Sequence, residues 1–122
     1  MFIRSLLVTA VVSIILPVAT ANAANTETCK ASWYGKAFHM KNPMANGKLF
    51  NMYDPTMVAH KKLPLGTEIR ITNLANGRSI IATVTDRGPF IPGRCVDVSM
   101  AGAKVLGFIK AGTARVKVDV VS

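Results

Sequence analysis

The chain has 122 residues, with 15 lysines and arginines against 6 aspartates and glutamates, and its formal net charge is +9. This length is enough for one compact domain and too short for two. The positive charge favours an anionic partner, although in a small domain it can also serve only to keep the protein soluble.

Residues 1–23 have the pattern of a secretory signal peptide. Arg4 precedes an apolar run over residues 6–18, and Ala21-Asn22-Ala23 forms a small-x-small cleavage site. The run is shorter than the roughly 20 residues of a membrane span, so we expect no transmembrane segment after cleavage. Since no cysteine ends the run, the sequence predicts an exported protein, periplasmic or secreted, that is not lipid-anchored.

Cleavage after Ala23 would leave one domain over residues 24–122. Arg4 is the only charged residue that cleavage removes, so the formal net charge falls from +9 to +8. For an exported protein, nucleic acid is not the expected partner. The bacterial cell wall is an anionic polymer outside the cytoplasm, with peptide and muramic acid carboxylates, and fits this charge better.

Two cysteines, Cys29 and Cys95, remain after cleavage. An even number of cysteines in a small exported domain predicts a disulfide. Closing so long a loop would stabilise the fold by about 4 kcal/mol in the chain-entropy model. No histidine or further cysteine is spaced to complete a metal site with them, so we expect no metal.

The segments in chain order predict short strands and one helix. A short aromatic strand over residues 30–35 precedes a long irregular loop over 36–53, a length that is usually functional. Alternation and turn residues then predict strands over 57–60, 68–74, 79–86, 95–98 and 114–120. Ser99 is expected to cap a helix over 100–106, which Gly107 ends. Such a pattern predicts a mainly β fold, a small barrel with one short helix.

Asp86 is the leading catalytic candidate. Ile80, Ala82 and Val84 share one face of the strand over 79–86, and the same register places Asp86 on that apolar face, at the strand end. There the carboxylate loses hydration, which disfavours its charged form, as a general acid near neutral pH requires. An aspartate before Arg-Gly-Pro is also ordinary turn chemistry.

Other side chains are weaker candidates for binding. Trp33 and Tyr34 could stack on sugar rings, with one of them more typical of the core. Arg87 could bind a substrate carboxylate or satisfy loop carbonyls. His60, at a strand end, could be catalytic or structural, and His39 lies in the irregular loop. Met40, Met44, Met52 and Met57 are expected to pack, and no cofactor is implied.

Many blocks of this chain resemble the rare lipoprotein A family of lytic transglycosylases. The resemblance covers nearly all of the domain and rests on Ala31-Ser32-Trp33-Tyr34-Gly35, Phe38-His39, Ala45-Asn46-Gly47, Ala59-His60-Lys61-Lys62-Leu63-Pro64-Leu65-Gly66-Thr67, Thr72-Asn73-Leu74-Ala75-Asn76-Gly77-Arg78-Ser79, Asp86-Arg87-Gly88-Pro89-Phe90 and Asp97-Val98-Ser99. It implies a six-stranded double-psi β-barrel, the fold of expansins and family 45 glycoside hydrolases.

The resemblance also implies an activity. These enzymes cut the glycan strand of peptidoglycan between N-acetylmuramic acid and N-acetylglucosamine without water, leaving 1,6-anhydro ends, in cell wall remodelling or division. The residue that matches the family's acid/base is Asp86, and the resemblance places His60 near it. It implies a protein that binds peptidoglycan glycan strands. We expect a monomer and no cofactor.

One residue departs from the family pattern. The glutamate that normally follows Ala-Asn-Gly is replaced by Lys48, which becomes a candidate for substrate binding together with Trp33, Tyr34 and Arg87. A cation there would favour an ionised Asp86, against a general acid. The alternative is therefore a non-catalytic, expansin-like module that binds and loosens the wall. A secreted inhibitor or effector on the same scaffold is a third class.

Overall fold

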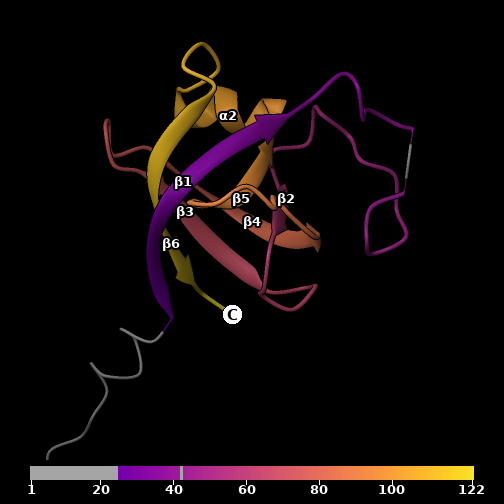
Figure 1. The fold of residues 1–122 in the computed structure, drawn as a ribbon, viewed down its shortest axis with the longest axis horizontal. Helices are drawn as coiled ribbons and strands as arrows, with labels where there is room; N and C mark the ends of the chain where they lie inside the picture. The colour runs from indigo at the N-terminus through magenta and orange to yellow at the C-terminus, as the bar shows by residue number, and fades with distance from the viewer. Residues whose placement is uncertain (1–24, 42) are drawn as a thin grey trace, which may run out of the picture.

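The computed structural model describes residues 25–41 and 43–122. These residues form a closed barrel of six strands in the order β1-β5-β2-β4-β3-β6 (Figure 1). The predicted signal peptide lies outside the described residues. In the part of the chain that is described, no helix is long and apolar enough to cross a membrane.

The strands and the helix fall close to their predicted positions. They are β1 (Thr26–Tyr34), β2 (Met57–His60), β3 (Glu68–Asn73), β4 (Ser79–Asp86), β5 (Arg94–Ser99), α2 (Met100–Leu106) and β6 (Thr113–Val120). Strand β1 begins four residues earlier than predicted, because Thr26 to Cys29 pair antiparallel with β6 through Asp119 to Val116. The mainly β barrel with one short helix is confirmed.

Alternating apolar residues fill the barrel. The valines and isoleucines of β2 to β6 that point inward are at most 1% exposed, among them Val58, Ile71, Val84, Val98 and Val116. Helix α2 packs on β1, β4 and β5 and buries Ala103 and Leu106 against this core (Figure 1). The Ser99 hydroxyl caps α2 by accepting from the Gly102 N–H at 3.0 Å, as predicted.

The loop between β1 and β2 has a small core of its own. Met44, Phe50 and Met52 are buried together and pack against Tyr34, Met57 and Met100. Met44, Met52 and Met57 are therefore packing residues, as predicted. The same prediction is wrong for Met40, which lies in a surface turn with φ 54° and is 53% exposed. This second core fixes the loop to the end of β1, so the loop residues 44–47 have a defined place beside β4.

A bulge in each of two strand pairs changes the direction of the next side chain. Between β2 and β4, Val58 opposes Val84 and Ala59 opposes Asp86, which leaves Thr85 as the extra residue. Between β1 and β5, Lys30 opposes Arg94 and Ala31 opposes Val96, which leaves Cys95 as the extra residue. Bulges re-aim side chains and are common beside active sites.

The bulge at Cys95 also brings the two cysteines together. Cys29 and Cys95 form the predicted disulfide, with their Cα atoms 5.9 Å apart. The bond joins β1 to the first residues of β5, where the Lys30 N–H also donates to the Gly93 carbonyl at 3.0 Å. This corner of the barrel is therefore held by a covalent bond and by backbone hydrogen bonds.

Candidate functional site

A cavity of about 320 Å³ lies at the end of β4, and we name it the carboxylate pocket. It contains both Asp86 and Asp97. Aromatic side chains and the loop that follows β4 complete its wall, which is formed by Tyr34, Phe38, Ala59, Arg87, Gly88, Pro89 and Phe90.

The pocket floor is a row of paired residues across four strands. Ser32 on β1 opposes Asp97 on β5, Asp97 opposes Ala59 on β2, and Ala59 opposes Asp86 on β4. Residues directly opposite in a sheet point to the same side. The two carboxyl groups therefore share the outer face of the barrel, with Ala59 between them and their Cα atoms about 10 Å apart from the spacing of strands.

The Asp86 side chain does not point in the direction that strand alternation predicted. Simple alternation would place this side chain with Ala82 and Val84, toward the barrel interior. The bulge at Thr85 adds one residue before Asp86 and turns the carboxylate to the outer face, beside Ala59. Asp86 is half-buried at the pocket rim instead of lying against the core.

Two backbone N–H groups fix the Asp86 carboxylate. Its Oδ1 accepts from the Ala45 N–H and from the Arg87 N–H, both at 2.9 Å. The Ala45 turn is itself tied to β4, because the Asn46 N–H donates to the Thr85 carbonyl at 3.1 Å. Oδ1 is thus occupied, and no described residue forms a hydrogen bond with Oδ2 of Asp86, which lines the pocket.

Asp97 is the site residue that the sequence reasoning did not single out. Burial raises the pKa of its carboxyl group above the ordinary value, and nearby Asp86 adds to the shift, while the Ser32 hydroxyl bond and Arg94 oppose it. The Ser32 hydroxyl donates to Asp97 Oδ1. The sequence signal for Asp97 as a site residue was a charged residue between two valines. The structure shows that both valines, Val96 and Val98, are fully buried.

Tyr34 contributes its hydroxyl group more than its ring. One face of the ring stacks on Phe50 with the centroids 4.1 Å apart, and its edge meets Phe38 at 5.9 Å. The hydroxyl is buried without a hydrogen-bond partner among the described residues. Burial, and then the charges of Asp86 and Asp97, raise the pKa of Tyr34, so this group stays a proton donor for hydrogen bonds.

The exposed aromatic rings at the pocket belong to residues other than Trp33. Trp33 is half-buried, packs against the barrel core and donates its ring N–H to the Ile109 carbonyl at 3.3 Å, and it is not part of the pocket wall. Phe38 and Phe90 line the pocket and are 50% and 80% exposed. They are the rings that a sugar could stack on.

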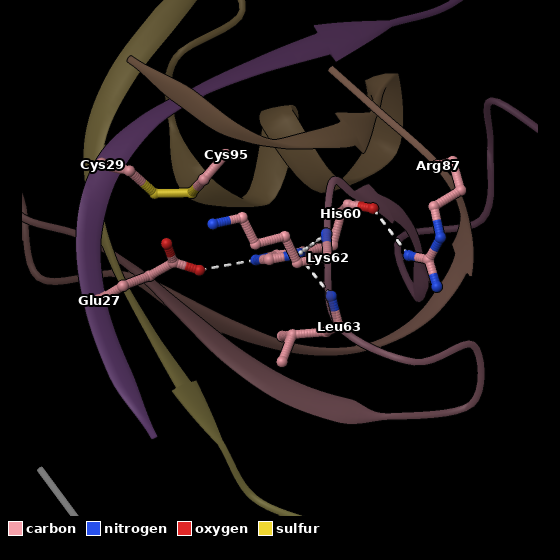
Figure 2. A network of polar contacts seen from close by, with 7 residues as sticks. All are labelled: Glu27, Cys29, His60, Lys62, Leu63, Arg87 and Cys95. Carbon is pink, nitrogen blue, oxygen red and sulfur yellow. Dashed lines mark hydrogen bonds and ion pairs between the residues drawn. A yellow bond between two sulfur atoms is a disulfide. The ribbon is translucent and has the colours of Figure 1, made fainter. Parts of the chain in front are cut away.

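The His60 side chain lies on the opposite face of the sheet from Asp86 and Asp97, contrary to the expectation that it is near the acid. It opposes Val96, on the inner face of the sheet, and is 2% exposed. Its Nε2 lies 2.6 Å from Glu27 Oε1, and its Nδ1 accepts from the N–H groups of Lys62 and Leu63 (Figure 2). Both ring nitrogens are occupied, so His60 fixes the turn after β2 and has no nitrogen for Asp86.

Arg87 and Lys48 differ in how they are held. The Arg87 guanidinium donates to the His60 carbonyl at 2.9 Å, which satisfies a backbone acceptor while the side chain still lines the pocket (Figure 2). Lys48 is exposed at the end of the turn that holds Asp86, and it forms no ion pair with any described residue. Lys48 is not part of the pocket wall.

One group of potential metal ligands occurs in the described residues: Glu27, Cys29 and Cys95. Both sulfur atoms are in the disulfide and are therefore not thiolate ligands. A single remaining carboxylate does not make a metal site.

Solved structures share this fold at low sequence identity. The Streptomyces papain inhibitor superposes with a TM-score of 0.63 at 21% identity, over 80% of this chain and 94% of that one. An expansin from Clavibacter michiganensis superposes with a TM-score of 0.61 at 20% identity, over 80% of this chain and 50% of that one. These neighbours establish the double-psi β-barrel.

Sequence relatives establish the family. The endolytic peptidoglycan transglycosylase RlpA of Vibrio cholerae is 46% identical over 97 residues, which are 80% of this chain and 36% of that protein. The chain thus spans about a third of the length of that relative. The profile of the family described as lytic transglycolase matches residues 26–118, nearly all of the barrel. The chain therefore belongs to the lytic transglycolase family, as its resemblance to the rare lipoprotein A proteins predicted.

Proposed function

We propose that this protein is an exported, endolytic peptidoglycan lytic transglycosylase in which Asp86 is the acid and base. The observation that carries the proposal is the geometry of Asp86. Its carboxylate stands in an open pocket, one oxygen held by two backbone N–H groups and the other free to exchange a proton. General acid–base catalysis needs such a positioned group within reach of the scissile bond.

In the first half of the reaction, Asp86 Oδ2 gives its proton to the glycosidic oxygen. The bond from that oxygen to the anomeric carbon of N-acetylmuramic acid breaks, and positive charge develops on the sugar ring. Asp86 becomes a carboxylate, and the N–H groups of Ala45 and Arg87 stabilise the new negative charge. The two donors are in place before the reaction and need no rearrangement.

In the second half, the same carboxylate accepts the proton of the muramic acid 6-hydroxyl. The hydroxyl oxygen attacks the anomeric carbon and closes the 1,6-anhydro ring. The proton that Asp86 gave is thereby returned, and no water is consumed. One carboxyl group is sufficient, in contrast with the two that glycoside hydrolases use.

The other groups of the pocket suit a carbohydrate. Phe38 and Phe90 provide apolar faces at the rim, and the Tyr34 hydroxyl is a buried donor without a partner among the described residues. A buried polar group without a partner costs free energy until a ligand satisfies it. Asp97, whose raised pKa favours a protonated carboxyl, adds a second group that can contact sugar hydroxyls.

Asp97 also favours a second candidate function. Two carboxyl groups on one face, with Cα atoms about 10 Å apart, are the elements of a hydrolase that activates water. A wall-binding module without chemistry, as the Lys48 departure suggests, is the other alternative. The two reactions give different products from the same substrate, and the binding module gives none.

The experiment is incubation of the protein with purified peptidoglycan, followed by mass spectrometry of the soluble fragments. The proposal predicts fragments with 1,6-anhydro ends, lighter by one water than the products of hydrolysis. The inactive variant is Asp86→Asn. Its matched control is Asp119→Asn, because the Asp119 carboxylate lies on β6 and pairs with Lys117 outside the pocket. Reducing ends would indicate the hydrolase, and binding without any new ends would indicate the module.

A further inference from the structure

A second cavity, of about 490 Å³, lies beside the disulfide between β1, the start of β5 and the turn after β2. We name it the cationic cavity. Four side chains with positive charge line it, Lys61, Lys62, Arg94 and Arg115, and the only carboxylate in its wall is Glu27. Figure 2 shows the Lys62 side chain extending from the turn toward β1.

The described residues that line the cationic cavity carry an excess of positive charge. Glu27 is bound to His60 Nε2 at 2.6 Å, and none of the four cations forms an ion pair within residues 25–41 and 43–122. The Arg94 Nε is buried and has no hydrogen-bond acceptor there. A buried donor of a charged group that lacks an acceptor is unfavourable and is expected to bind one.

The strand register increases the local positive charge. Lys30 on β1 opposes Arg94 on β5 and Arg115 on β6, so three cations stand in one row across three strands. Like charges directly opposite in a sheet repel each other and destabilise it. An anion bound beside this row would remove the repulsion.

The row lies next to the proposed reaction site. Lys30 is two residues before Ser32 on β1, which is about 7 Å along a strand, and Ser32 begins the row that carries Asp97 and Asp86. Arg94 is also close enough to Asp97 to lower its pKa against the effect of burial. Asp97 is thus the carboxylate that faces Arg94 from the pocket, yet the two form no ion pair among the described residues.

We propose that the cationic cavity is a carboxylate-binding subsite that holds peptidoglycan while Asp86 acts on a neighbouring sugar. The inference rests on the proposed function for the identity of the polymer. Its ligand chemistry is a carboxylate, and peptidoglycan offers two sources, the free lactyl group of muramic acid and the carboxylates of the stem peptide. Arginine and lysine side chains bind either through charge-assisted hydrogen bonds.

The test is a titration followed by backbone amide shifts in NMR, which reports binding at the cavity without any need for catalysis. The probes are N-acetylmuramic acid, its methyl ester, and the first two residues of a stem peptide. We expect an acid probe to shift the amides of Lys30, Arg94 and Arg115, and the ester to bind at least about tenfold more weakly, as for a lost charge-assisted bond. The acid probe that shifts these amides identifies which part of peptidoglycan supplies the bound carboxylate.

The test variant combines Lys30→Gln and Arg115→Gln, both at exposed positions. The control variant combines Lys104→Gln, on α2, and Lys110→Gln, after α2, which are also exposed. The first pair should weaken acid binding about tenfold or more and raise the melting temperature, since it removes repulsion. The control pair should bind like the native protein. Equal binding of acid and ester, or unchanged affinity in the first pair, would overturn the subsite.

These outcomes separate the subsite from the proposed function. Acid binding that depends on Lys30 and Arg115, in a protein that releases no glycan fragments, would support the subsite and contradict the activity. Release of anhydro fragments by a protein whose cavity binds neither acid would support the activity and contradict the subsite.

Discussion

The carboxylate pocket and the cationic cavity lie side by side on β1 and β5 and have opposite charges. The pocket presents Asp86 and Asp97, and the cavity presents Arg94 and Arg115, which Lys30 joins in one row across the strands. Each depends on a bulge, at Thr85 for the pocket and at Cys95 for the cavity. One added residue per strand is therefore enough to place unlike chemistry at neighbouring sites of the barrel.

Asp86 and His60 are both catalytic candidates from the sequence, with Asp86 the leading one, and their hydrogen bonding differs. Asp86 keeps one oxygen free in an open pocket, whereas both nitrogens of His60 are occupied by Glu27 and the following turn. A free hydrogen-bonding atom at an accessible place is what chemistry requires, and full occupation is what a structural role requires.

The largest effect is expected for Asp86→Asn. The change keeps the shape and the acceptor for the Ala45 and Arg87 N–H groups but removes the proton that the reaction needs. Release of anhydro fragments should fall by about 10²- to 10⁴-fold, while binding to insoluble peptidoglycan stays nearly unchanged. A variant that cuts glycan at the native rate would show that Asp86 is not the acid.

His60→Ala should affect folding more than chemistry. It leaves the N–H groups of Lys62 and Leu63 and the Glu27 carboxylate without their partner, which should lower the free energy of unfolding by about 3 kcal/mol. Chemical denaturation measures this loss. The rate per folded molecule should fall far less than in Asp86→Asn; an equal fall, in protein shown to be folded, would place His60 in the chemistry.

Tyr34→Phe removes only the hydroxyl group and keeps the stack on Phe50. If that hydroxyl binds substrate, kcat/KM should fall about tenfold, the value of one lost hydrogen bond. Stability should not fall, because the hydroxyl has no partner among the described residues. A lower melting temperature with unchanged kinetics would instead indicate a structural hydroxyl.

Asp97→Asn should change the pH dependence of stability. Burial raises the pKa of Asp97, so the folded state holds this proton more tightly than the unfolded chain. The stability from that proton is full below the ordinary value of 3.8 and is lost as the pH rises through the folded pKa. The neutral asparagine should therefore raise the melting temperature at neutral pH and give no gain near pH 3. Asp119→Asn should give no comparable gain.

The smallest effect is expected for Lys48→Glu. The substitution restores the residue type of the family and places a negative charge on the turn that holds Asp86, which favours the protonated acid. Because Lys48 is exposed and solvent screens its charge, activity should rise only about two- to threefold, by the same rate assay. Activity that appears only in Lys48→Glu would show that the native chain has lost its chemistry.

Local patterns predicted most of the fold but not the direction of the site residues. Alternation located β3, β4 and β6, and Ser99 and Gly107 marked the ends of α2. The bulge at Thr85 has no signature in residue type, so alternation placed Asp86 on the wrong face. The sequence did not indicate Asp97 as a site residue, because the residues opposite it in the sheet come from β1 and β2. The partner of His60 is 33 residues away in the sequence, which no local pattern reveals.

The measurement that tests the central claim most directly is cleavage of purified peptidoglycan in water enriched in oxygen-18. If Asp86 alone transfers the proton and the muramic acid 6-hydroxyl is the nucleophile, the new ends carry 1,6-anhydro rings and no heavy oxygen. The native protein should give this product, and Asp86→Asn should give almost none. Incorporation of oxygen-18 at the new ends would contradict the account, because water would then be the nucleophile and a second carboxylate its base.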